Sequence, residues 1–212
     1  MLAVLGFTGG LLWSFNRNTG RGGPVPINRP GTPAGLTAFG STAYHFMIDV
    51  PGTWEAIDPS SPGEQAALRE MEQMNPDLGS SLSQGASQLS QSGIRLVAIN
   101  PVEGSDGLTS NLFVIAQKAS NYSSSLLYQM ADAFPAAVAE VGGTVTGTSF
   151  VTIDGHRALR ATDTVSMFGP LGTETVIDQT VYAVGANGFV YSITLTGNDP
   201  DMAAIASTFS TN

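Results

Sequence analysis

Two stretches of the sequence decide the fold: residues 144–167, TVTGTSFVTIDGHRALRATDTVSM, and residues 173–196, TETVIDQTVYAVGANGFVYSITLT. Both are rich in valine, threonine and aromatic residues, which favour β-strands. Each is interrupted by a dipeptide that favours a two-residue hairpin turn, Asp154-Gly155 in the first stretch and Asn187-Gly188 in the second. The sequence therefore predicts four strands joined as two hairpins. The predicted strands are Thr144–Ile153, His156–Met167, Thr173–Val184 and Phe189–Thr196.

Elements on the N-terminal and C-terminal sides of these hairpins complete an α+β fold. Apolar residues recur at helical spacing over Ser125–Val141, where Pro135 predicts either a kink or two short helices. We expect the aromatic side chains of Trp54 and Tyr191 to lie in the core. The other predicted elements are strands at Tyr44–Val50, Trp54–Ile57, Ile94–Asn100 and Asn111–Gln117, and helices at Ser61–Met74, at Leu78–Leu89 and after Asp199-Pro200. Together they predict a curved antiparallel β-sheet flanked by helices.

Composition and charge exclude several classes of protein. The 212-residue chain contains no cysteine, so a disulfide scaffold, a thiol nucleophile and a cysteine-based metal site are excluded. Residues 41–212 carry all 17 acidic residues and five basic ones, a net charge of −12. A domain this acidic repels the phosphate backbone of nucleic acids. The sequence therefore predicts no nucleic-acid partner.

The first fifteen residues, MLAVLGFTGGLLWSF, form an uncharged apolar run. A helix of this length rises roughly 22 Å at about 1.5 Å per residue, whereas the hydrocarbon core of a bilayer is about 30 Å thick. The run is typical either of the second half of a membrane anchor that begins upstream or of a short uncleaved signal anchor, and a buried N-terminal helix is the alternative. The candidate anchor residues are Leu11, Leu12, Trp13 and Phe15, since tryptophan favours the membrane interface.

Residues 16–40 are predicted to be a linker that joins this apolar segment to a globular domain at residues 41–212. Ten of the 25 linker positions are glycine or proline, which favours an extended tether over a helix. The three arginines Arg17, Arg21 and Arg29 would favour a cytoplasmic side for the domain by the positive-inside rule. Residues upstream could reverse that balance, so charge alone leaves the membrane orientation open.

The motifs of common enzyme classes are missing from the sequence. The two histidines, His45 and His156, lack the spacing of a metal site. No G-x-S-x-G elbow, Walker loop or dinucleotide-binding glycine pattern occurs. Glu70 and Glu72 are two residues apart on a predicted helix, so they do not face each other as a catalytic carboxylate pair. We therefore expect a protein that is not an enzyme and has no cofactor and no metal.

The order of these elements resembles that of the Mog1/PsbP-like α/β/α sandwich superfamily. The resemblance covers roughly residues 41–210 and is carried by an aromatic strand that leads into a P-G-x-W turn, by a hairpin, by a late strand and by a closing helix. These motifs are Tyr44-His45-Phe46 with Pro51-Gly52-Thr53-Trp54, Ile153–Ala158, Gly188–Ile193 and Ser207-Thr208-Phe209. The superfamily includes an accessory subunit of photosystem II and actinobacterial envelope lipoproteins, and it has no shared catalytic residues. The lack of cysteine departs from the lipoproteins, so the apolar N-terminus would have to serve as the anchor.

Two functions follow as hypotheses. In the first, an extracytoplasmic domain on a single N-terminal anchor in the cell membrane is an accessory subunit or binding module that docks on a membrane protein complex, such as respiratory or envelope machinery. In the second, the chain is an envelope carrier that binds a lipid or glycolipid in an apolar groove. The candidate groove or docking residues are Met74, Leu78, Leu82, Leu89, Met130 and Phe134. An apolar cavity lined by them would favour the carrier, and a filled core with an exposed apolar patch would favour docking.

Overall fold

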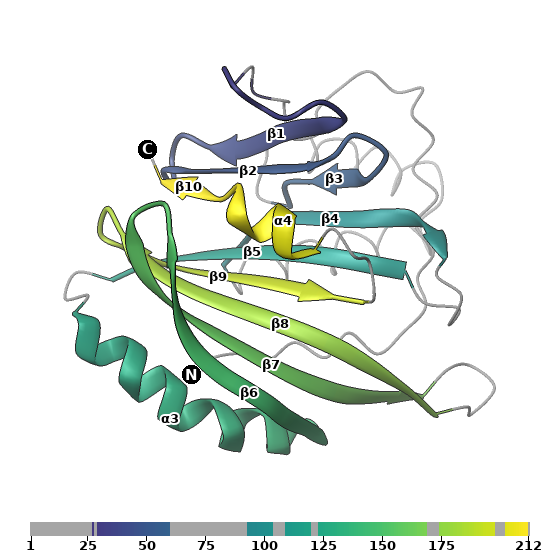
Figure 1. Cartoon of the computed structure of the whole chain (residues 1–212), viewed down its shortest axis with the longest axis vertical. Coiled ribbons are helices and arrows are strands. Elements are labelled where there is room, and N and C mark those ends of the chain that lie inside the picture. Colours follow the sequence, from purple (N-terminus) through teal and green to yellow (C-terminus); the bar gives the residue numbers. More distant parts are fainter. Residues whose placement is uncertain are drawn as a thin grey trace, which may run out of the picture.

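The computed structural model describes residues 27, 29–59, 93–103, 109–119, 123–168, 174–197 and 202–211. Most of these residues form a curved seven-stranded sheet whose neighbouring strands are all antiparallel, in the order β3-β4-β5-β9-β8-β7-β6 (Figure 1). The strands are β3 (Glu55–Ile57), β4 (Ile94–Glu103), β5 (Thr109–Lys118), β6 (Gly143–Ile153), β7 (His156–Phe168), β8 (Glu174–Ala186) and β9 (Phe189–Thr196). The predicted α+β class with a curved antiparallel sheet is confirmed. The helices predicted at Ser61–Met74 and Leu78–Leu89 lie outside the described residues.

Both predicted hairpin turns are present. Asp154 and Gly155 have φ angles of 50° and 73°, and Asn187 and Gly188 have 51° and 75°. Two successive positive φ angles define a type I′ turn, whose twist matches that of the strands it joins. The two turns connect β6 to β7 and β8 to β9 in the register that the sequence predicts.

A second, three-stranded sheet has the order β1-β2-β10. Its strands are β1 (Leu36–Ser41), β2 (Phe46–Pro51) and β10 (Ser210–Thr211). Here the structure differs from the sequence analysis, because residues 36–40, which were assigned to the linker, belong to β1. Their glycine- and proline-rich surroundings obscure a strand that pairs with β2 and buries Ala38 and Phe39. The first predicted strand also begins later, at Phe46, since His45 lies in the β1–β2 turn with φ 52°.

An aromatic cluster joins the small sheet and the C-terminal segment to one face of the large sheet. Tyr191 of β9 is fully buried, and its ring centroid lies 5.3 Å from that of Phe209 and 6.2 Å from that of Phe46. Its hydroxyl lies 2.8 Å from the carbonyl oxygen of Tyr44 and 3.2 Å from that of His45, to which it donates. Trp54 belongs to the same core cluster. The expectation that Trp54 and Tyr191 are core residues is confirmed.

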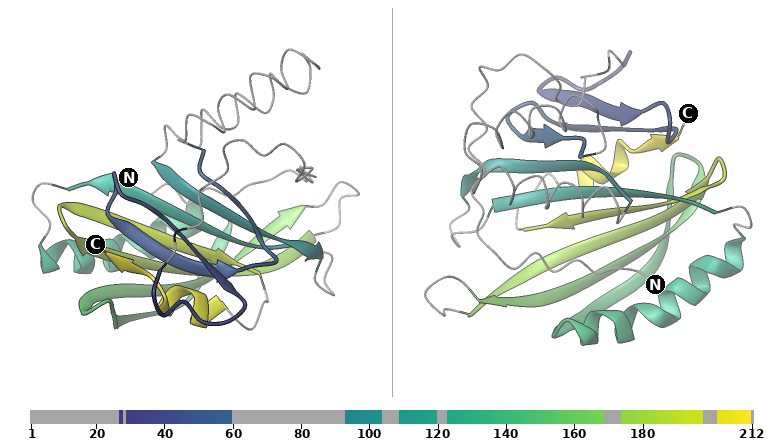
Figure 2. Two further views of the ribbon diagram at one scale, coloured as in Figure 1. Left: turned by 90° about the horizontal axis from the view of Figure 1, so that it is seen from above. Right: turned by 180° about the vertical axis from the view of Figure 1, so that it is seen from behind.

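Helix α3 (Ser124–Glu140) covers the opposite face of the large sheet, over β6, β7 and β8 (Figures 1 and 2). It is one helix that includes Pro135, so the alternative of two short helices is wrong. Pro135 is exposed, while the neighbouring Phe134 and the more distant Val138 are buried against the sheet and hold the helix on both sides of the proline. The short helix α4 (Met202–Ser207) matches the predicted C-terminal helix and buries Ile205.

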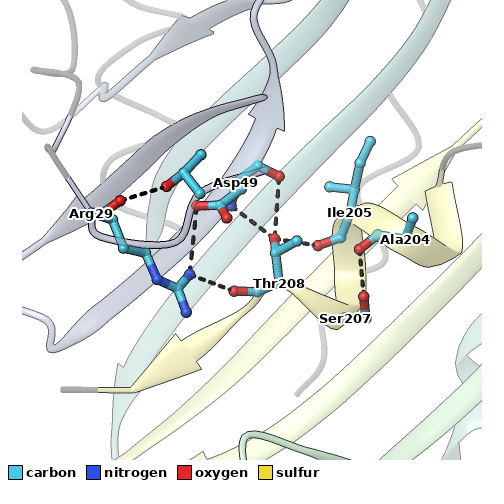
Figure 3. A network of polar contacts seen from close by, with 7 residues as sticks. Arg29, Asp49, Ala204, Ile205, Ser207 and Thr208 are labelled. Carbon is cyan, nitrogen blue, oxygen red and sulfur yellow. Dashed lines mark hydrogen bonds and ion pairs between the residues drawn. The ribbon is translucent and has the colours of Figure 1, made fainter. Parts of the chain in front are cut away.

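A polar network fastens the start of the described chain to its end (Figure 3). Arg29 Nη1 donates to the carbonyl oxygen of Thr208 at 2.9 Å and lies 3.5 Å from Asp49 Oδ1. Thr208 Oγ1 accepts from the backbone N–H of Asp49 at 2.8 Å and lies 2.7 Å from the carbonyl oxygen of Ile205. Asp49 is only 3 % exposed, and a buried carboxylate left without a partner is costly. Arg29, predicted to lie in the linker, therefore belongs to the folded domain.

These contacts predict different effects on stability for two N-terminal deletions. The contacts described above begin at Ile27 and Arg29, so we expect deletion of residues 1–26 to leave the melting temperature unchanged. Deletion of residues 1–41 removes Arg29 and β1, and loss of the buried Phe39 side chain alone should cost roughly 3 kcal/mol or more. Thermal unfolding followed by circular dichroism compares the two truncated chains. Equal melting temperatures would contradict the assignment of β1 and Arg29 to the domain.

Candidate docking surface

The structure describes two of the six candidate groove residues, and both are occupied in packing α3 on the sheet. Met130 contacts the cluster of Leu127, Leu159 and Ala183, and Phe134 contacts that of Val138, Ala161 and Val181. Their exposed fractions are 8 % and 2 %. Met74, Leu78, Leu82 and Leu89 lie outside the described residues, as do the anchor residues Leu11, Leu12, Trp13 and Phe15.

An exposed cluster of two aromatic rings and one guanidinium lies where α3 meets β6. Tyr128 of α3 is 46 % exposed, and its ring centroid is 4.8 Å from that of Phe150 on β6. The guanidinium carbon of Arg157, on β7, lies 4.3 Å from the Phe150 centroid and 4.9 Å from the Tyr128 centroid. These distances are those of cation–π contacts. We call Tyr128, Phe150 and Arg157 the edge cluster, because Phe150 belongs to the last strand of the sheet.

Strand β6 is this last strand, and within the described chain it pairs only with β7. In an antiparallel ladder, alternate residues direct their backbone N–H and C=O groups toward the partner strand and away from it. The two-residue turn makes Ile153 and His156 a hydrogen-bonded pair, so Thr152, Phe150 and Thr148 direct these groups away from β7. β6 therefore presents a row of backbone donors and acceptors at the edge of the sheet.

The edge carries few of the features by which proteins block unwanted strand pairing. Such features include charged side chains, prolines and β-bulges. β6 contains no charged residue and no proline, and its one irregularity lies between Val145 and Gly147, before the regular part at residues 148–153. The exposed arginines Arg157 and Arg160 lie next to it on β7, and they face opposite sides of the sheet.

The acidic residues near β6 do not neutralise these arginines. Asp154, in the β6–β7 turn, accepts hydrogen bonds from the backbone N–H and the hydroxyl of Thr211, at 2.7 and 2.9 Å. Asp132 and Glu140 of α3 are exposed. Among the described residues, neither Arg157 nor Arg160 has a carboxylate oxygen within 4.0 Å. The guanidinium of Arg157 therefore has N–H groups available to a ligand.

Asp163 of β7 is a buried carboxylate beneath α3. It is 1 % exposed, and neither of its oxygens has a hydrogen-bond partner among the described residues. Like Ala161 and Leu159, two and four positions earlier on the strand, it lies on the face that α3 covers. Its partners in the strand register are Val145 of β6 and Gln179 of β8. Burial raises the pKa of Asp163 from 3.8 to about 6.

The two histidines lie in a turn and at the start of a strand. The ring of His45 in the β1–β2 turn lies 6.1 Å from the ring of Phe189, and His156 is the first residue of β7. No group of three or more histidine, aspartate or glutamate side chains suited to hold a metal ion occurs in the part of the chain that the structure describes. Neither described helix has the length and apolar character needed to cross a membrane.

Comparison with known proteins identifies the fold. The chain is similar to the solution structure of cyanobacterial PsbP (CyanoP) from Synechocystis, with 14 % sequence identity and a TM-score of 0.54 over 90 % of this chain and 100 % of that one. LpqN of Mycobacterium tuberculosis, described as involved in cell envelope biogenesis, is similar with 14 % identity and a TM-score of 0.45 over 89 % and 90 % of the two chains. No family model and no curated protein sequence matches the chain. The resemblance to the Mog1/PsbP-like superfamily is thus confirmed as a likeness of fold.

The raised pKa of Asp163 predicts how stability depends on pH. Between pH 3.8 and about 6 the folded protein binds a proton that the unfolded chain does not, so the free energy of unfolding decreases as the pH rises through this window. Above it the ionised carboxylate destabilises the fold by about 3 kcal/mol, by the conversion of 1.36 kcal/mol per pKa unit. Asp163→Asn should therefore raise the melting temperature at pH 7.5 and have a much smaller effect at pH 4.

The matched control is Asp178→Asn, which changes an exposed carboxylate on the neighbouring strand β8. It should shift the free energy of unfolding by less than about 0.5 kcal/mol at either pH. Urea titrations at both pH values measure the three proteins. If the difference between Asp163→Asn and the unmodified chain is the same at pH 4 and pH 7.5, burial of an ionised carboxylate is not its cause.

Proposed function

We propose that the chain is a non-enzymatic binding module of the cell envelope. Its apolar residues 1–15 anchor it in the cell membrane, its folded domain lies outside the cytoplasm, and that domain docks on a membrane protein complex as an accessory subunit. The likeness to CyanoP supports only the fold. The proposed docking is argued from the packing and the charge of this chain's own residues.

The observation that carries the proposal is that both described groove candidates are used in packing the fold. Met130 and Phe134, which an apolar groove would need, are packed between α3 and the sheet. On the other face of the sheet, Phe46, Tyr191 and Phe209 fill the space beneath the small sheet. A carrier needs an apolar cavity, whereas a docking module needs only its surface. The edge cluster offers such a surface.

The charge distribution supports docking on a protein. The net charge of −12 over residues 41–212 steers the domain toward a basic surface and away from anionic lipid head groups. The ion pair of Arg29 with Asp49 fixes the point at which the proposed tether enters the domain. A tether attached to a rigid body restricts its orientation at the membrane and raises the local concentration at which it meets a partner in the same membrane.

Affinity purification of the full chain from detergent-extracted membranes of its own cells tests this function. The captured material is washed in NaCl rising from about 0.1 to 1 M, over which the Debye length falls from about 10 to 3 Å. We expect one membrane protein to co-purify in fixed stoichiometry and to be released as salt rises, with no lipid in fixed stoichiometry by mass spectrometry. The chain without residues 1–26 should leave the membrane fraction.

A different outcome would support the carrier instead. Burial of apolar groups is insensitive to moderate salt or is strengthened by it. A lipid retained in fixed stoichiometry across the whole salt series, with no protein partner, would contradict the docking function.

A further inference from the structure

The edge of β6 has the geometry for pairing with one more strand. Thr148, Phe150 and Thr152 direct their backbone N–H and C=O groups away from β7, and no charge or proline lies among residues 148–153. Peptides that bind by strand addition obtain affinity from such main-chain hydrogen bonds and specificity from alternate side chains. Arg157 supplies a charged side chain beside this segment, because it is the register partner of Thr152.

The side chain of Arg157 extends from β7 to a ring of the edge strand β6. Its backbone is on β7, yet its guanidinium carbon lies 4.3 Å from the centroid of Phe150, the ring of a β6 residue. An added strand would lie about 4.8 Å beyond β6. A side chain on the α3-covered face of that strand would therefore come within reach of the guanidinium, whose N–H groups suit a carboxylate.

From this geometry we propose that β6 binds an extended segment of a partner protein by antiparallel strand addition, with one aspartate or glutamate of that segment paired with Arg157. The inference rests on the proposed docking function and names the surface that performs it. Tyr128 and Phe150 stack with Arg157 and hold its guanidinium in place before binding, which lowers the entropy lost on binding.

A second copy of this chain is a less suitable occupant of the edge. Antiparallel pairing of two β6 strands adds the arginines Arg157 and Arg160 of a second copy to this edge, and β6 itself supplies no carboxylate to pair with them. Like charges placed close together at an interface oppose association. Sedimentation equilibrium of the full chain tests this occupant: we expect a monomer, and a dimer that Thr148→Pro abolishes and Thr148→Ala retains would overturn the proposal.

Two variants of one residue test the strand addition. Thr148→Pro removes an N–H that points away from β7, so the ladder with β7 is retained while an added strand loses a hydrogen bond and meets the pyrrolidine ring. Thr148→Ala keeps the N–H and is the matched control. The probe is a fluorescein-labelled peptide of alternating threonine and valine with one central glutamate and a lysine at each end. Fluorescence anisotropy with the full chain measures its dissociation constant.

We expect Thr148→Pro to weaken peptide binding at least about tenfold and Thr148→Ala to change it less than about twofold. Replacing the central glutamate of the peptide by glutamine should weaken binding to the unmodified chain by about fivefold, but not binding to Arg157→Gln. Lys118→Gln, which removes an exposed charge on β5, is the control for net charge. Equal binding to Thr148→Pro and to Thr148→Ala would overturn the proposal.

Two further measurements keep the test decisive. If circular dichroism shows that Thr148→Pro is unfolded, the same peptide with alternate backbone nitrogens methylated replaces the variant, and it must fail to bind the unmodified chain. Purification from membranes then separates the two proposals. A partner that co-purifies equally with Thr148→Pro and with the unmodified chain overturns the β6 surface and leaves docking intact, whereas the absence of any partner on the unmodified chain contradicts the docking function itself.

Discussion

The buried side chain of Tyr191 is the interaction on which the arrangement of the two sheets depends. It lies on β9, the central strand of the large sheet, and its hydroxyl donates to the carbonyl oxygens of the β1–β2 turn. Its ring contacts Phe46 of the small sheet and Phe209 after α4. The Tyr191 hydroxyl is protonated at neutral pH and can donate, and burial raises its pKa further above the ordinary value. One residue thus joins three parts of the chain that are distant in sequence.

The parts of the fold that could be predicted from the sequence are those specified by local chemistry. Asp154-Gly155 and Asn187-Gly188 favour one turn type wherever they occur, so the hairpins were predicted correctly. β1 was not predicted, because glycine and proline surround it and its stability comes from pairing with β2 rather than from its own sequence. Pro135 does not divide α3 into two short helices, because the apolar contacts of Phe134 and Val138 stabilise one continuous helix on both sides of the proline.

The candidate site was less predictable, because it depends on which strand ends the sheet. The sequence of β6 shows an uncharged strand, but only the strand order shows that it is an edge, and only the packing of α3 brings Tyr128 to Phe150 and Arg157. Asp163 did leave a signal in the sequence. Asp163 is separated from Leu159 and Ala161 by an even number of positions along β7. Because side chains alternate between the two faces of a strand, its carboxylate is predicted to lie on the same buried face as these two apolar residues.

The exposed edge of β6 has two opposite consequences for binding. Strand β6 is already ordered by its pairing with β7 and by its contacts with α3, so binding does not have to order the strand to which a partner is added. The same open edge is a liability, because an unblocked strand can pair with any extended chain. The bulge before Thr148 limits the open part of β6 to a short segment, and Arg157 would select among the segments that fit it.

Residue-resolved amide hydrogen exchange on the full chain, free and bound to its co-purified partner, tests strand addition most directly. The N–H groups of Thr148, Phe150 and Thr152 point away from β7, whereas those of Ser149 and Val151 are already paired with it. Binding should slow exchange at the first three by at least about tenfold and change the other two little. Unchanged exchange at all three residues, with new protection elsewhere in the chain, would contradict the assignment of β6 as the docking edge.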